Sequence, residues 1–131
     1  MRPRLWLLLP AVCLHAGDLS LTLAGQPASY WAGDYATATE YNPIWSPLLA
    51  RHPAAFVAGA LVWLAVFAAI ILKWRHPLAA WLAIAVAMGS ALGGSSWFAR
   101  HGAAGWLLAV LYLSAAAHLS RLCWRRAIAA T

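Results

Sequence analysis

The sequence predicts an all-α membrane protein with four transmembrane helices, and two observations carry that prediction. Of the 131 residues, 64% are hydrophobic and only 9% are charged, whereas about a quarter of the residues of an ordinary soluble domain are charged. The apolar residues also gather in four segments of about 20 residues, the length that crosses a hydrocarbon core as a helix. We expect one membrane domain spanning residues 1–131, with helices at about 5–26, 54–73, 78–98 and 103–122 and an ordered, aromatic-rich loop at 27–53.

The first segment carries polar side chains that a lipid-facing helix would not carry. At 100° per residue, His15, Asp18 and Thr22 fall within one sector of the helix. A carboxylate within a span costs about 2.5–3.5 kcal/mol on insertion scales, so it normally faces the protein interior and has a partner. We expect His15 and Thr22, each about one turn away, to hydrogen-bond Asp18. Asp18 is then either a packing anchor or one wall of a pocket.

Small residues form a second stripe on the opposite side of this helix. Stripes of small residues let two helix backbones approach closely in lipid, and the third span carries a matching pattern. We expect these two stripes to pack together, namely Ala16, Ser20 and Ala24 against Ala85, Gly89 and Gly93.

The N-terminus also allows a different interpretation. The segment "MRPR" followed by "LWLLLPAVCLHAG" resembles a signal peptide, and "TLA" at 22–24 offers a cleavage site. The stretch between the apolar core and that site is long and holds His15 and Asp18, which favours an uncleaved span.

The loop at 27–53 is rich in aromatic side chains, which gather at membrane–water interfaces. We expect a short helix from about residue 29 to 40, with Asp34, Thr37 and Glu40 on its wetter side. The pairs Asn42–Pro43 and Ser46–Pro47 are typical of helix starts. The loop is therefore expected to be folded against the membrane, with a belt formed by Tyr30, Trp31, Tyr35, Tyr41 and Trp45.

Three spans are preceded by an arginine–histidine pair. These are Arg51–His52–Pro53, Arg75–His76–Pro77 and Arg100–His101–Gly102. Such pairs suit ligands or proton carriers, but helix-start turns at the interface explain them more simply, because proline at the first helical position loses no hydrogen bond and arginine reaches the headgroups.

The distribution of basic residues orients the chain. One side of the four-span topology holds seven Lys and Arg residues, and the other side holds only Arg51 and Arg100. By the positive-inside rule, we expect both termini on the cytoplasmic side of a bacterial inner membrane. The basic residues cluster at segment ends and form no long polar face, so nucleic acid is excluded as a partner. The seven are Arg2, Arg4, Lys73, Arg75, Arg121, Arg125 and Arg126.

This topology brings the polar residues of two spans and two loops to one extracytoplasmic region. Asp18 and Glu40 are the candidate catalytic acid and base, since no carboxylate follows Glu40 in the chain. No metal-binding spacing such as His-x-x-x-His or Cys-x-x-Cys occurs. The sequence indicates no particular cofactor. We expect no disulfide between Cys13 and Cys123. The candidate binding residues are Asp18, Thr22, Glu40, Asn42, Ser95, Ser96, Arg100 and His101.

At these residues the chain resembles a family of small bacterial polytopic membrane proteins of unknown function. Their pattern is Asp-x-x-x-Thr on the first helix and Glu-x-Asn-Pro before the second, which corresponds here to Asp18, Thr22, Glu40, Asn42 and Pro43. The resemblance implies that these five residues belong to one feature. This chain departs from the pattern by a long aromatic loop between the two parts.

Three classes of function suit these observations. A non-enzymatic accessory or scaffold protein, embedded in the lipid bilayer and binding a membrane-protein partner or a second copy, accounts for the small size and the small-residue stripes. A membrane-embedded hydrolase would use Asp18 and Glu40. Proton- or ion-coupled transport would run through Asp18. We favour the first because no site signature supports the other two.

Overall fold

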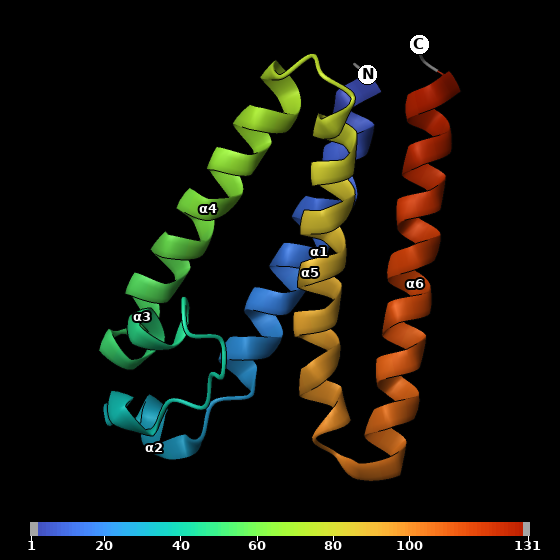
Figure 1. Ribbon diagram of the computed structural model, residues 1–131. Helices are drawn as coiled ribbons and strands as arrows, with labels where there is room; N and C mark the ends of the chain where they lie inside the picture. Colours follow the sequence, from blue (N-terminus) through green and yellow to red (C-terminus); the bar gives the residue numbers. More distant parts are fainter. Residues whose placement is uncertain (1–2, 130–131) are drawn as a thin grey trace.

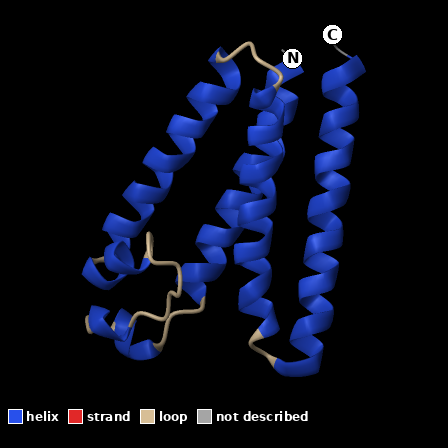
Figure 2. Cartoon of the chain, in the orientation of Figure 1, coloured by secondary structure: helices blue, strands red, loops and turns tan. Residues whose placement is uncertain are grey.

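The computed structural model describes residues 3–129, and this part of the chain contains helices, turns and loops but no strand (Figures 1 and 2). Four helices are long and apolar enough to cross a membrane, so the expected fold class is confirmed. The elements are α1 (Pro3–Ala24), α2 (Ala28–Trp31), η1 (Tyr35–Thr37), α3 (Ser46–Arg51), α4 (Pro53–Lys73), α5 (Leu78–Ala99) and α6 (Gly102–Ala129).

Helices α1, α5 and α6 pack against one another, and α4 contacts α1 and α5. Figure 1 shows both ends of the chain and the α4–α5 connection at one end of the bundle, which we call the terminal end. The first loop and the α5–α6 turn lie at the other end, which we call the loop end. Arg2, one of the residues that orient the chain, lies outside the described residues.

The interface between α1 and α5 uses small residues, but not the expected ones. Ala87 and Ala91 of α5 are buried against Ala11 and Leu14 of α1. The predicted contact is wrong, because most of the two stripes is exposed, namely Ala16, Ser20, Ala24, Ala85 and Gly89. The polar sector of α1 takes the interface instead, since a polar group left in lipid costs far more than an alanine does.

Of the three histidines in the arginine–histidine pairs, two accept a hydrogen bond from the first turn of the helix that follows. The Nδ1 atom of His52 accepts a hydrogen bond from the Ala54 amide at 3.0 Å, and Nδ1 of His76 accepts one from the Leu78 amide at 3.2 Å. Each imidazole thus satisfies an N–H group that has no partner within its own helix. The helix-start interpretation is confirmed for these two. The third pair leads into a turn at Gly102, whose φ of 68° suits glycine.

The first loop is folded, but the expected helix over 29–40 is wrong. Gly33, with a φ of 104°, ends α2 and separates it from η1. Tyr30 is fully buried and donates its hydroxyl to the Leu49 carbonyl at 3.1 Å. Burial, with a smaller effect of the neighbouring Tyr35, raises the pKa of Tyr30, so this donor stays protonated. The helix expected at Ser46 is α3, whereas Pro43 begins only a turn.

Helix α6 continues seven residues beyond the predicted span. Its basic residues mark the end of the apolar segment, but a charge does not end a helix that extends into water. The guanidinium of Arg126 lies 4.7 Å from the centre of the Trp6 ring, and Cys123 and Ala127 are buried. Packing against α1 therefore supports this last part of α6.

Candidate functional site

A cavity of about 450 Å³ lies at the loop end, between α1, α4, α5 and the loop segment 40–45. Its polar lining combines two carboxylates, one guanidinium, an amide and hydroxyl groups, and its apolar lining is largely aromatic. The polar wall consists of His15, Asp18, Thr22, Glu40, Asn42, Ser96 and Arg100, and the aromatic wall of Tyr41, Trp45, Phe56 and Trp97.

Asp18 lies half-buried on this wall, close to the backbone of α5. A Cβ atom placed on Gly93 would be 2.6 and 2.7 Å from the two carboxylate oxygens of Asp18. Glycine at this position therefore makes room for the carboxylate. Within residues 3–129, the Asp18 carboxylate makes no hydrogen bond and no ion pair.

His15 does not contact Asp18, contrary to the sequence-based prediction. Its Nε2 atom lies 3.2 Å from the Ala60 carbonyl and its Nδ1 atom 3.3 Å from the Ser90 hydroxyl. Because a carbonyl oxygen only accepts, Nε2 carries the proton in this pair. The imidazole thus joins α1 to both α4 and α5, and its role here is to hold the three helices together.

Thr22 also has a different partner from the predicted one. Its hydroxyl oxygen accepts a hydrogen bond from Nε1 of Trp97 at 3.0 Å, and both side chains are buried. The Trp97 ring lies where a Cβ atom on Gly25 would be, so a glycine also permits this contact. The Trp97 indole therefore lies between α1 and α5 at the loop end, where it lines the cavity.

Arg100 is held by aromatic rings rather than by a carboxylate. Its guanidinium carbon lies 3.6 Å from the centre of the Trp97 ring and 5.1 Å from the centre of the Tyr41 ring. Such contacts favour a cation through the negative face of the ring. No ion pair joins Arg100 to Asp18 or Glu40 among the described residues.

The loop wall of the cavity is shaped by its own side chains. The Glu40 carboxylate accepts a hydrogen bond from the backbone N–H of Asn42 at 2.7 Å. The side-chain oxygen of Asn42 accepts one from the backbone N–H of Ile44 at 3.0 Å. The Asn42 carbonyl then accepts from the amides of Trp45 and Ser46, where α3 begins. Asn42 therefore fixes the turn that leads from the cavity into α3.

Gln26 connects this wall to α1 and was not anticipated from the sequence. Its side chain is buried, donates to the Thr22 carbonyl at 2.7 Å, and accepts from the Thr39 amide at 2.8 Å. The residue beside Glu40 is thus held against the end of α1. No sequence motif marks Gln26, because a glutamine before a proline is ordinary in a loop.

The cavity brings together six of the eight predicted binding residues, and two lie elsewhere. Ser95 is buried and donates its hydroxyl to the Leu92 carbonyl at 2.9 Å, and His101 sits in the α5–α6 turn outside the lining. The two candidate catalytic carboxylates, Asp18 and Glu40, line the same cavity, and no hydrogen bond joins them within the described residues. All five residues of the family-like pattern line the cavity, namely Asp18, Thr22, Glu40, Asn42 and Pro43.

Residues 3–129 contain no group of three His, Cys, Asp or Glu side chains that could hold a metal ion. Comparisons with known proteins add no family: no protein-family model, curated protein or solved structure matches this chain.

Proposed function

We propose that this chain is a non-enzymatic accessory or scaffold protein of a bacterial inner membrane that binds a small cationic group in its loop-end cavity. The observation that carries the proposal is the Asp18 carboxylate, which faces the cavity without a partner among the described residues. A carboxylate at membrane depth normally has a partner, because leaving it unpaired is costly. A bound cation supplies that partner.

The charges around the cavity favour a cation over an anion. Asp18 and Glu40 place two carboxylates on its wall, whereas Arg100 is the one basic side chain in the lining besides His15. The positive charge of Arg100 is directed over Trp97 and Tyr41. A primary amine or a quaternary ammonium group of modest size fits this charge balance, and Trp45 and Phe56 offer further ring surface to it.

The orientation assigns a side to the cavity. Seven Lys and Arg residues belong to the terminal side of the topology and two to the loop side. By the positive-inside rule both termini are cytoplasmic and the cavity opens toward the extracytoplasmic side. The cationic group would then arrive from outside the cytoplasm. The family-like residues on the cavity wall suit a shared binding feature.

The test is thermal unfolding of the full chain in lipid nanodiscs, with ethanolamine and tetramethylammonium as cationic probes and acetate as the anionic control. A cation at a hundredfold excess over its Kd stabilises the folded state by about 2.7 kcal/mol. The cations should raise Tm and acetate should not. Asp18→Asn and Glu40→Gln should lose the shift, whereas the matched variant Asp34→Asn should keep it, since Asp34 is exposed and outside the lining. An equal shift with acetate, or an undiminished shift in Asp18→Asn, would overturn the proposal.

A membrane-embedded hydrolase is the second candidate, and one observation favours it. Asp18 and Glu40 line one cavity but differ in setting, because Glu40 accepts a backbone hydrogen bond and Asp18 does not. Two carboxylates in different environments suit an acid and a base. Turnover of chromogenic ester and phosphodiester substrates, abolished by both Asp18→Asn and Glu40→Gln but not by Asp34→Asn, would select the hydrolase over the binding protein.

A further inference from the structure

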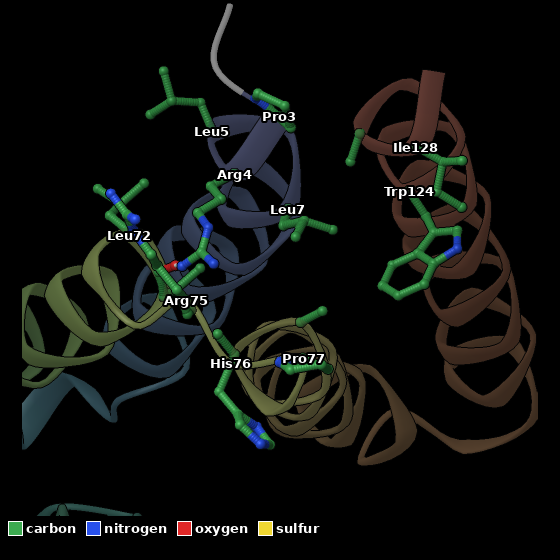
Figure 3. A pocket seen from close by; sticks show the side chains of 14 residues that line it. Pro3, Arg4, Leu5, Leu7, Leu72, Arg75, His76, Pro77, Trp124 and Ile128 are labelled. Carbon is green, nitrogen blue, oxygen red and sulfur yellow. The ribbon is translucent and has the colours of Figure 1, made fainter. Parts of the chain in front are cut away.

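A second, larger cavity of about 820 Å³ lies at the terminal end of the bundle, away from the loop-end site. It is bounded by the first residues of α1, the α4–α5 connection and the last turns of α6 (Figure 3). Figure 3 shows Leu7 of α1 and Trp124 of α6 on opposite sides of it, with Arg4 and Arg75 toward the α4–α5 connection. Most of its lining is apolar, and its polar groups are basic.

The charged side chains that line this cavity are of one sign. The three acidic residues all precede Tyr41, and Asp18 and Glu40 line the cavity at the other end. Arg4, Arg75 and His76 line the terminal-end cavity, and no Asp or Glu does. A cavity with this lining is electrostatically complementary to an anion.

Arg4 is positioned by the end of α4. One of its guanidinium nitrogens donates to the carbonyls of Ile71 at 3.0 Å and of Trp74. A guanidinium carries five donors, so the N–H groups of its other two nitrogens remain available. Arg75 is exposed beside it and makes no hydrogen bond within the described residues. The cavity thus holds one arginine fixed by the fold and one that is free to approach a ligand.

The start of α5 adds a further positive element to the same wall. Pro77, Ala79 and Ala80 line the cavity at the N-terminus of this 22-residue helix. The N–H groups of Leu78, Ala79 and Ala80 are already bonded to His76 and Pro77. This helix start therefore contributes the positive end of its dipole and no free amide. Two arginines therefore lie on the side of the cavity formed by the start of α1 and the α4–α5 connection, and Trp124 and Ile128 of α6 lie opposite them (Figure 3).

From this arrangement we infer that the terminal-end cavity is a binding site for an anionic phospholipid. The phosphate lies against Arg4 and Arg75, and an acyl chain lies between Leu7 of α1 and the Trp124 and Ile128 side chains of α6. The apolar lining and the volume favour a lipid over free phosphate, which would leave most of the cavity unfilled. Basic pockets between helices on the cytoplasmic side are suited to anionic headgroups. The site is separate from the loop-end cavity, so the two proposals stand or fall independently.

Native mass spectrometry of the full, delipidated chain tests this inference with phosphatidylglycerol and phosphatidylcholine of identical acyl chains. We expect phosphatidylglycerol to be retained preferentially, and glycerol 1-phosphate and inorganic phosphate not to displace it. Arg75→Ala should weaken phosphatidylglycerol binding about fivefold. The matched control Arg125→Ala removes an exposed arginine of α6 that lies at the same end of the bundle but does not line the cavity. This variant should change binding little.

A second pair of variants tests the cavity rather than the charge. Ala80→Phe places a ring in the cavity and should reduce retention of the lipid, whereas Ala85→Phe, on an exposed face of α5 outside the lining, should not. Equal retention of the two lipids, equal effects of the two arginine variants, or unchanged binding in Ala80→Phe would overturn the inference. Displacement by inorganic phosphate would identify free phosphate as the ligand and overturn it also.

Discussion

Two glycines four residues apart on α5 provide the sharpest test of the loop-end cavity. A Cβ atom on Gly93 would lie 2.6 Å from an oxygen of Asp18, whereas nothing lies within 4 Å of a Cβ atom on Gly89. Gly93→Ala therefore forces the Asp18 carboxylate to move, and Gly89→Ala is its matched control. A comfortable C···O contact is about 3.3 Å or longer, so the carboxylate must retreat by roughly 0.7 Å.

The expected effects on stability and on binding differ in size. Replacing glycine by alanine in a helix favours folding by up to about 1 kcal/mol, and moving the Asp18 side chain off its rotamer costs about 0.5–1.5 kcal/mol. These opposing terms leave the free energy of unfolding of Gly93→Ala within about 1 kcal/mol of the parent chain. A charged hydrogen bond to a ligand contributes about 1.5–3 kcal/mol, so its loss weakens binding roughly 10- to 100-fold.

The assay is calorimetric titration with ethanolamine in nanodiscs, with thermal unfolding as the measure of folding. Gly89→Ala should bind as the parent chain does and unfold at the same temperature or higher. Gly93→Ala should remain folded and lose binding. If both variants bind ethanolamine equally well, Asp18 is not the group that holds the ligand, and the binding argument fails.

Three further predictions concern the structure around the cavity. In a double-mutant cycle of Thr22→Val and Trp97→Phe, the coupling energy should be about 0.6 kcal/mol and no more than about 1.7 kcal/mol; additive effects on unfolding would mean that the hydrogen bond between these two side chains contributes nothing. Gln26→Leu should speed hydrogen exchange of the Thr39 amide without a comparable change within α5, because the side-chain oxygen that accepts from this amide is lost; unchanged exchange would contradict the anchoring role of Gln26. Reporter fusions after Arg75 and Thr131 should be active as cytoplasmic reporters and one after Ala38 as an extracytoplasmic reporter, and the opposite pattern would reverse the orientation.

The helices were predictable because the length and hydropathy of a segment along the chain are enough to identify a membrane span. A segment of about 20 apolar residues has little choice but to span as a helix, and the predicted starts lie within two residues of the observed ones. The end of α6 was missed because hydropathy marks where the apolar segment ends, whereas the helix continues past Arg121 to Ala129. The predicted loop helix is interrupted at Gly33, which adopts a positive φ. Glycine allows either sign of φ, so the sequence alone did not indicate this break.

Packing between helices was less predictable, as α1 illustrates. Its sequence offered two faces, a polar one through His15 and a small-residue one through Ala16, and both were expected to need protein neighbours. Only one face of α1 contacts α5, and the polar face occupies it. Alanine can face lipid at little cost, whereas an imidazole cannot, so energetic cost rather than pattern decides which face is buried.

Side-chain partners were the least predictable part of the candidate site. The pattern placed His15 and Thr22 one turn from Asp18, and proximity along α1 suggested hydrogen bonds among them. Their partners come instead from other helices, Ser90 and Trp97 of α5 and the Ala60 carbonyl of α4. A helical projection gives the depth and the face of a residue, but the rotations of neighbouring helices select what meets it.

The distribution of satisfied groups along α1 bears on the two interpretations of Asp18. Its neighbours on the same face, His15 and Thr22, have hydrogen-bond partners within the protein, as does Gln26 just beyond the helix. Asp18 is the one carboxylate among the four and makes no hydrogen bond within the described residues. A carboxylate whose role was to anchor helix packing would be the first to be paired, since an unpaired charge in the membrane loses more free energy than an unpaired hydroxyl. Its position on the cavity wall, beside a glycine that leaves room for it, therefore favours a binding role over a packing role.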